Sequence, residues 1–143
     1  MKGVDDVRIA FASDDENESV SAVRSYIESH HDLVAVADAD SWPTMSRAVA
    51  ESVATGGSDL GVLMCWTGTG TAISANKVRG IRAATVADAR TARGARLWND
   101  ANVVALSLKR LAPDVAVECV TAFIEQEQFD PDEAATIDMI RDL

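Results

Sequence analysis

The chain has 143 residues, enough for one domain that folds around its own core without disulfides or metals. Thirteen Lys and Arg residues oppose twenty-three Asp and Glu residues, and the formal charge of −10 argues against nucleic acid or an anionic membrane as a partner. Two widely spaced cysteines and no signal-like opening favour a reducing cytoplasm. The apolar runs are all too short to span a bilayer.

Short apolar runs alternate along the chain with segments of helical spacing, a pattern typical of a parallel sheet covered by helices. The expected strands are residues 7–11, 33–36, 61–64, 81–85 and 103–106, and the expected helices are residues 16–29, 43–54, 71–77, 88–97 and 113–125. Apolar residues at helical spacing in 131–143 predict a further, C-terminal helix. We therefore expect one α/β domain over residues 1–143, a three-layer sandwich with a five-stranded parallel sheet.

Residues 61–76 carry the strongest chemical signal in the sequence. An apolar strand ends at Cys65, and the turn at 67–71, Thr-Gly-Thr-Gly-Thr, leads into a helical pattern. Such a turn presents backbone N–H groups to an anion, and a thiol beside the positive end of a helix loses its proton more readily than a free thiol. The run predicts a reaction site, although Cys65 taken alone fits a small buried apolar residue better than a reactive thiol.

The strand order indicates what lies opposite this cysteine. In open parallel sheets, ligands bind beyond the carboxyl ends of the strands where the strand order reverses. For the order 2-1-3-4-5 this point lies between the first strand, which is followed by Asp14, and the third strand, which ends at Cys65. We expect these two side chains to face each other across one crevice.

Three sequence blocks carry a family resemblance. They read Cys-x-Thr-Gly-x-Gly at 65–70, Ala-Asn-Lys-Val-x-Gly-Ile-Arg-Ala at 75–83, and Asn-Asp-x-Asn-Val-x-Ala-Leu at 99–106. In order and spacing they resemble the ribose-5-phosphate isomerase B family, which includes the galactose-6-phosphate isomerase subunits. The resemblance implies a Rossmann-like sheet of order 2-1-3-4-5, a homodimer or tetramer with active sites shared between subunits, and aldose–ketose isomerisation through an enediol. It implies no metal or organic cofactor.

The resemblance also assigns roles to single residues. Cys65 matches the base that moves the proton between sugar carbons, Thr67 matches the hydroxyl that transfers a proton between oxygens, and Asp14 matches an aspartate near the ring oxygen. Asn99 matches an asparagine that contacts substrate from the other subunit. The pocket for the negative oxygen of the enediolate matches the turn residues Thr67, Gly68, Thr69, Gly70 and Thr71.

Two family histidines are missing from this chain. Asp15 stands where the family has a histidine that helps hold the substrate, and Trp98 stands where it has the histidine proposed to open the sugar ring. Ring opening is therefore unassigned. Asp15 either acts as an acid or base, if crowding with Asp14 raises one carboxyl pKa, or only stabilises the start of the first helix.

The end that binds phosphate in the family is altered as well. Near the C-terminus the family carries arginines, whereas this chain carries Asp130, Asp132 and Glu133, which repel a phosphate. Lys109 stands where the family has another arginine and offers a substitute anion site without the bidentate fork of a guanidinium. A phosphorylated substrate held in the family's usual way is therefore disfavoured.

All three tryptophans fall at positions that match the family's site. Trp42, Trp66 and Trp98 either form flat platforms for a sugar, which would reshape the pocket, or fill space at a dimer interface. The sequence favours a cytoplasmic isomerase of a sugar or sugar phosphate with altered specificity. The alternatives are a non-catalytic sugar-binding homologue and a subunit that completes the site of a different chain. His30 and His31 show no spacing typical of metal ligands.

Overall fold

Five parallel strands form one sheet in the computed structural model, which describes residues 6–36 and 41–143. The strands are β1 (Arg8–Ser13), β2 (Asp32–Val34), β3 (Leu60–Cys65), β4 (Ala83–Thr85) and β5 (Val103–Ser107). The helices are α1 (Glu18–His30), α2 (Trp42–Ala54), α3 (Thr69–Ala75), α4 (Ala89–Asn99), α5 (Pro113–Glu125) and α6 (Ala134–Asp138), with a 3-10 turn η1 (Pro131–Glu133) before α6. Within these ranges no helix combines the length and apolarity needed to cross a membrane.

The predicted Rossmann-like sandwich is confirmed, but the order of its last two strands is not the predicted one. The observed order is β2-β1-β3-β5-β4, so β5 lies between β3 and β4. All five residues of β5 are buried, as expected of a strand paired on both sides, whereas β4 has three residues that are half-buried or exposed. A short, partly exposed strand suits the sheet edge, where it pairs on one side only.

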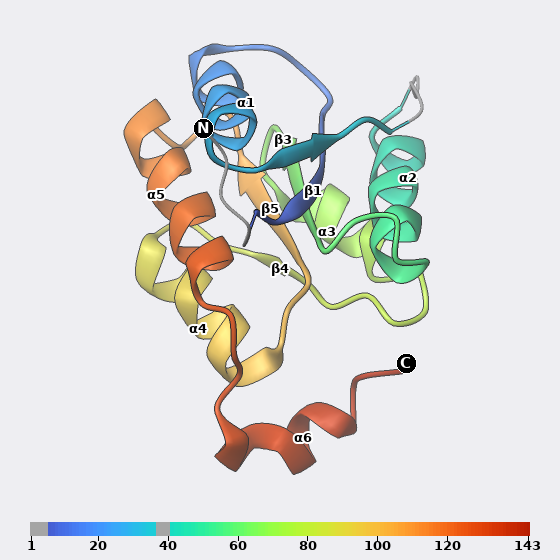
Figure 1. Cartoon of the computed structure of the whole chain (residues 1–143). Coiled ribbons are helices and arrows are strands. Elements are labelled where there is room, and N and C mark those ends of the chain that lie inside the picture. Colours follow the sequence, from blue (N-terminus) through green and yellow to red (C-terminus); the bar gives the residue numbers. More distant parts are fainter. Residues whose placement is uncertain (1–5, 37–40) are drawn as a thin grey trace.

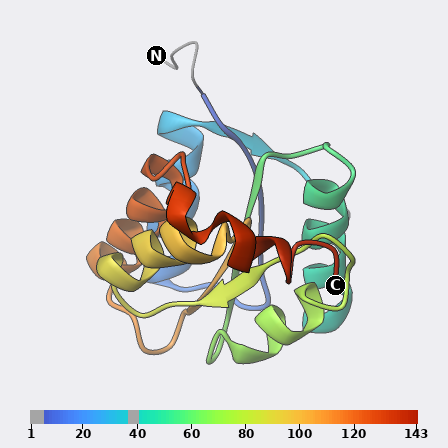
Figure 2. The same cartoon turned by 90° about the horizontal axis from the view of Figure 1, so that it is seen from below.

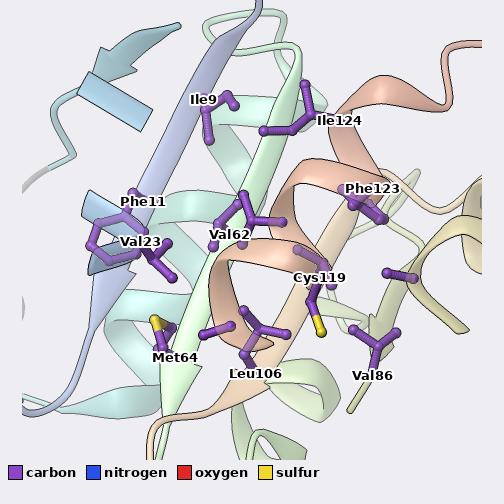
Figure 3. Close-up of a cluster of buried hydrophobic side chains, with 14 of the residues drawn as sticks. Ile9, Phe11, Val23, Val62, Met64, Val86, Leu106, Cys119, Phe123 and Ile124 are labelled. Carbon is purple, nitrogen blue, oxygen red and sulfur yellow. The ribbon is translucent and has the colours of Figure 1, made fainter. Parts of the chain in front are cut away.

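Helices cover both faces of the sheet (Figure 1). Helices α1, α4 and α5 lie on one face and α2 and α3 on the other, and the view from below separates the two layers clearly (Figure 2). The larger core fills the first face, where Val62, Leu106 and Phe123 pack together around the buried Cys119 (Figure 3). Cys119 is fully buried in this core, as its helical spacing predicts, and the burial raises the pKa of its thiol to about 11.

Local sequence signals explain where the main helices begin. The side chains of Asn17, Ser41 and Asp88 each accept a backbone N–H from the first turn of α1, α2 and α4, respectively. Pro43 and Pro113 occupy first turns, where a proline lacks only an N–H that has no helical partner. These positions agree with the expected helix starts to within about two residues.

The predicted helix over 131–143 is shorter in the structure. Helix α6 ends at Asp138, and the chain then turns so that the Arg141 guanidinium lies 2.9 Å from the carboxylate of Asp100. Asp100 also lies 3.5 Å from the guanidinium of Arg82, which donates a hydrogen bond to the Arg141 carbonyl. This network attaches the C-terminal segment below α4 and β4 (Figure 1).

Gly61 in β3 allows α2 to pack closely on the sheet. A Cβ atom at this position would lie 2.7 Å from Cγ1 of Val49 on α2 and 3.1 Å from Cγ2 of Val103. Both neighbours are stiff, β-branched side chains in a fully buried layer, so they cannot move aside easily.

We therefore predict that Gly61→Ala lowers the free energy of unfolding by about 1–3 kcal/mol. Denaturant titration at fixed pH measures this change. Val49→Ala opens the space that the new methyl group needs, so the double variant should be more stable than the sum of the two single changes allows. Simple additivity of the two substitutions would contradict the proposed steric conflict.

Candidate functional site

A cavity of about 390 Å³ opens where β1 and β3 end beside each other. The two strands pair in parallel up to Ser13 and Met64, and the backbone N–H of Asp14 then donates a hydrogen bond to the Met64 carbonyl at 3.2 Å. Residues from three stretches of the chain line the cavity, namely Asp14, Trp42, and Cys65, Trp66, Thr67, Thr69 and Gly70. Asp14 and Cys65 thus meet at one cavity, as the strand ends predict.

The sulfur of Cys65 is held by two hydrogen-bonding groups. The residue is only 5% exposed. The backbone N–H of Gly68 donates to its Sγ at 3.2 Å, and Oγ1 of Thr71 lies 3.3 Å from the same atom. The sulfur therefore contacts one N–H donor and one hydroxyl, and the residue also lines the cavity.

The turn after Cys65 requires glycine for both conformation and space. Gly68 has a φ of 79°, and a Cβ there would lie 2.9 Å from the Leu106 carbonyl carbon. As the capping residue of α3, Gly68 has no side chain to accept the N–H groups of Gly70 and Thr71. At Gly70 a Cβ would lie 3.0 Å from the ring of Trp42, so the indole rests directly on the turn.

The threonines of the turn fall into two groups. Thr67 and Thr69 line the cavity, and their hydroxyl oxygens lie 2.7 Å apart. Thr71, expected in the anion pocket, is fully buried and lies behind the sulfur rather than in the cavity lining. Thr85, which sequence reasoning missed, donates its hydroxyl to the Gly68 carbonyl at 2.8 Å. Its only signal in the sequence is its place at the end of a strand.

The two neighbouring aspartates have different environments. Asp14 is exposed at the rim of the cavity that it lines, and partial desolvation there, with a smaller contribution from the charge of Asp15, raises the pKa of its carboxyl. The carboxylate of Asp15 instead accepts the backbone N–H of Glu16 at 2.8 Å, and Asp15 is absent from the cavity lining. Asp14 is therefore the aspartate of this pair that lines the cavity.

A cation lies over one of the cavity tryptophans. The Nζ atom of Lys109 is 4.5 Å from the ring centroid of Trp66, a distance suited to a cation–π contact. Ser107 links the two segments, because its hydroxyl donates to the Trp66 carbonyl at 2.6 Å. An exposed positive charge and a half-exposed indole thus lie together, but only the indole lines the cavity, and Lys109 is absent from the lining.

Trp98 and Asn99 lie outside this cavity. They line a separate hollow of about 380 Å³ beside β4 and α4, together with Arg90. The Trp98 ring packs on Gly94, where a Cβ would approach it to 2.6 Å. Within one chain, therefore, the structure does not bring these two predicted site residues to Cys65.

The acidic residues that replace the family's arginines are also absent from the cavity lining. The Asp130 carboxylate accepts the N–H of Asp132 and so begins the 3-10 turn. Arg141 follows, but it is engaged by Asp100 and Asp138. In the part of the chain that the structure describes, no three His, Cys, Asp or Glu side chains are grouped so as to hold a metal ion.

Comparison with known proteins identifies the family. The model of the family described as Ribose/Galactose Isomerase matches residues 9–140, so the chain belongs to this family. It is 44% identical over 84 residues to the galactose-6-phosphate isomerase subunit LacB of Clostridium acetobutylicum. The aligned segment covers 59% of this chain and 49% of that protein. The chain is 39% identical over 100 residues to D-erythrulose-4-phosphate isomerase 2 of Mycolicibacterium smegmatis, which covers 70% and 65%. These matches span about half to two-thirds of the curated relatives.

Solved structures resemble the chain over nearly its whole length. The type B ribose 5-phosphate isomerase of Trypanosoma brucei has a TM-score of 0.79 at 31% identity, covering 95% of this chain and 97% of that one. A ribose 5-phosphate isomerase of Thermotoga maritima has a TM-score of 0.81 at 29% identity, covering 94% and 97%. The shared fold thus extends beyond the segment of highest sequence identity.

The raised pKa of Asp14 predicts how stability depends on pH. The folded protein holds this proton to higher pH than the unfolded chain, so stability falls as pH rises from the ordinary aspartate pKa, about 3.9, through the raised value. Asp14→Asn should therefore increase the free energy of unfolding at pH 7, and the gain should disappear below about pH 4.

Urea titrations from pH 3 to 7 measure this difference between variant and parent. Glu118→Gln removes an exposed carboxyl on α5 and serves as the control for the change in net charge. If Asp14→Asn raises the free energy of unfolding equally at pH 3 and pH 7, the raised pKa of Asp14 is not the cause of the increase.

Proposed function

We propose that the chain is an aldose–ketose isomerase that moves a proton between neighbouring carbons of a sugar through an enediol, with Cys65 as the base. The observation that carries the proposal is the placement of Cys65, which lines the cavity while its sulfur contacts two hydrogen-bonding groups. Membership of the ribose/galactose isomerase family supports the reaction class.

The negative charge of the enediolate needs donors that are already in position. Gly70 lines the cavity in the first turn of α3, where backbone N–H groups lack helical partners. The hydroxyl of Thr67 is available for proton transfer between the two substrate oxygens, and that of Thr69 lies 2.7 Å away as its hydrogen-bond partner. Backbone and hydroxyl groups are sufficient for this step, without an organic cofactor.

Asp14 is the second acid–base group of the proposal. A carboxyl with a raised pKa keeps its proton to higher pH than an ordinary aspartate, so it can donate that proton to a sugar oxygen. Ring opening, for which the family's histidine is replaced by Trp98, is therefore assigned to Asp14 rather than to Asp15. The exposed carboxylate of Asp15 contributes through its charge, which favours the protonated form of Asp14.

The substrate is a sugar with a specificity that differs from that of its relatives. Their names include isomerases of galactose 6-phosphate, ribose 5-phosphate and D-erythrulose 4-phosphate. In this chain Trp42 and Trp66 supply flat apolar walls for a sugar face, and Lys109 supplies a cation above the Trp66 ring. A short substrate with at most one anionic group, held by Lys109, fits this arrangement.

A homodimer with shared sites completes the proposal. Asn99 and Trp98 lie on a hollow separate from the Cys65 cavity, so they reach a substrate only from a second subunit. A second candidate is a subunit that requires a different partner chain, which the name of the LacB relative favours. Absence of exchange by the protein alone, and its appearance with such a partner, would support that candidate.

The first test of the proposed reaction is exchange of solvent deuterium into a panel of free and phosphorylated tetroses, pentoses and hexoses, followed by NMR. Wild-type protein should exchange the carbon-bound proton of at least one sugar. Removing a general base should lower this rate by about 10²–10⁴-fold, so we expect this loss for Cys65→Ala. Cys119→Ala, which changes a buried core thiol, should retain the exchange rate once folded. Full activity of Cys65→Ala would refute the assignment of the base.

Subunit complementation tests the shared site. Cys65→Ala and Asn99→Ala chains, each poorly active, should regain about a quarter of wild-type activity when co-refolded at equal amounts, because half of random dimers are mixed and one of their two sites is intact. Cys65→Ala with Thr67→Val is the matched control, since both changes affect the same subunit's part of each site. Recovery in the control, or none in the first mixture, would contradict sharing.

A further inference from the structure

The hydroxyl of Thr71 lies between two possible acceptors. Its oxygen is 3.3 Å from Sγ of Cys65 and 3.4 Å from the carbonyl oxygen of Gly68, and the residue is fully buried. A hydroxyl has one proton and therefore donates to one of these atoms at a time. The Gly68 carbonyl also accepts the Thr85 hydroxyl at 2.8 Å, so it keeps a partner when Thr71 turns away.

We propose that Thr71 is a positioning residue whose hydroxyl follows the protonation state of Cys65. The proposal deepens the proposed function and rests on it for its catalytic meaning. When sulfur carries the proton, S–H donates to Thr71 and Thr71 donates to the Gly68 carbonyl. When the proton has left, the Thr71 hydroxyl turns and donates to the sulfur anion, beside the N–H of Gly68.

The reorientation of the Thr71 hydroxyl follows the proton that moves in the proposed reaction. As the base acts, a C–H bond of the sugar breaks, an S–H bond forms on Cys65, and the electron pair stays on the substrate as an enediolate. The hydroxyl of Thr71 then turns back to the Gly68 carbonyl. Each step is reversed when the proton returns to the neighbouring carbon, so Thr71 ends where it began.

A role in packing alone does not explain a hydroxyl at this position. Valine has nearly the same shape, and burying a hydroxyl costs free energy unless it is hydrogen-bonded. Among the residues described, no buried side-chain nitrogen or oxygen lacks a hydrogen-bond partner. The Thr71 hydroxyl is therefore satisfied by the groups around the sulfur. A hydrogen bond to a sulfur anion is charge-assisted and therefore stronger than one to a neutral thiol.

Two charged side chains belong to the segments that border Cys65. Asp14 lines the same cavity from the end of β1, and Lys109 lies above Trp66 on the segment after β5. The residues contributed by α2 and β4 at this point are Trp42 and Thr85, which carry no charge. A pH measurement on Cys65 must therefore separate the effect of Thr71 from that of Asp14.

Alkylation of Cys65 by iodoacetamide, measured against pH by peptide mass spectrometry, tests the proposal without any sugar. Thr71→Val should move the midpoint of the alkylation rate upward by about 1–2 pH units, the size expected for a hydrogen bond to a charged group. The shift should recur in the Asp14→Asn background. Thr71→Ser, which keeps the hydroxyl, should retain the wild-type midpoint.

Two further variants sharpen the comparison. Thr85→Val leaves the Gly68 carbonyl dependent on Thr71, so the midpoint should also rise, but by less. Thr121→Val removes a hydroxyl bonded to a backbone carbonyl within α5 and should leave the midpoint unchanged. If Thr71→Val does not fold, Thr85→Val and Thr71→Ser carry the test.

An unchanged midpoint in folded Thr71→Val, an equal shift in Thr71→Ser, or an unchanged midpoint in Thr85→Val would overturn the proposal. The failure of the proposed function is a separate outcome. Should wild-type protein exchange no sugar proton while Thr71→Val still shifts the alkylation midpoint, the hydrogen-bond role stands and the isomerase proposal fails. If wild-type protein exchanges a sugar proton but Thr71→Val leaves the alkylation midpoint unchanged, the isomerase proposal stands and the role of Thr71 fails.

Discussion

The approach of the Gly68 turn to β5 is the constraint on which the site depends. Gly68 adopts a positive φ and lies so close to the Leu106 backbone that no side chain fits between them. This contact brings the Gly68 N–H within 3.2 Å of the Cys65 sulfur and starts α3 directly afterwards. Because β5 lies beside β3 in the sheet, the strand order itself determines that contact. Strand packing thereby fixes the donor that faces the sulfur.

The surroundings of the sulfur combine polar groups of the turn with an aromatic cavity wall. Behind Cys65, backbone and threonine groups can pair with either protonation state of a thiol. In front of it, Trp42 lies on Gly70, and Trp66 lies under the Lys109 cation. The turn thus supplies polar groups around the sulfur, whereas two indole rings form much of the cavity wall.

The C-terminal segment shows how an arginine can be present and yet unavailable to a ligand. Arg141 lies near the end of the chain, but its guanidinium bonds to Asp100 and Asp138. Asp100 has a positive φ at the end of α4, immediately after Asn99. The ion pairs therefore hold the C-terminal segment against the residues that the proposed partner site would use. In this chain the arginine supports the structure of that region.

The sequence by itself determined the α/β class, the main helix starts and the meeting of Asp14 with Cys65, because these depend on local periodicity, capping residues and the ends of parallel strands. Only the tertiary structure decided that β5 precedes β4 across the sheet, since strand order follows from burial on both sides rather than from chain order. It also decided that Thr71 lies behind the sulfur with Thr85 close by. Thr71 and Thr85 lie in different elements of the chain, and only the packing of those elements brings both hydroxyl groups to the Gly68 carbonyl.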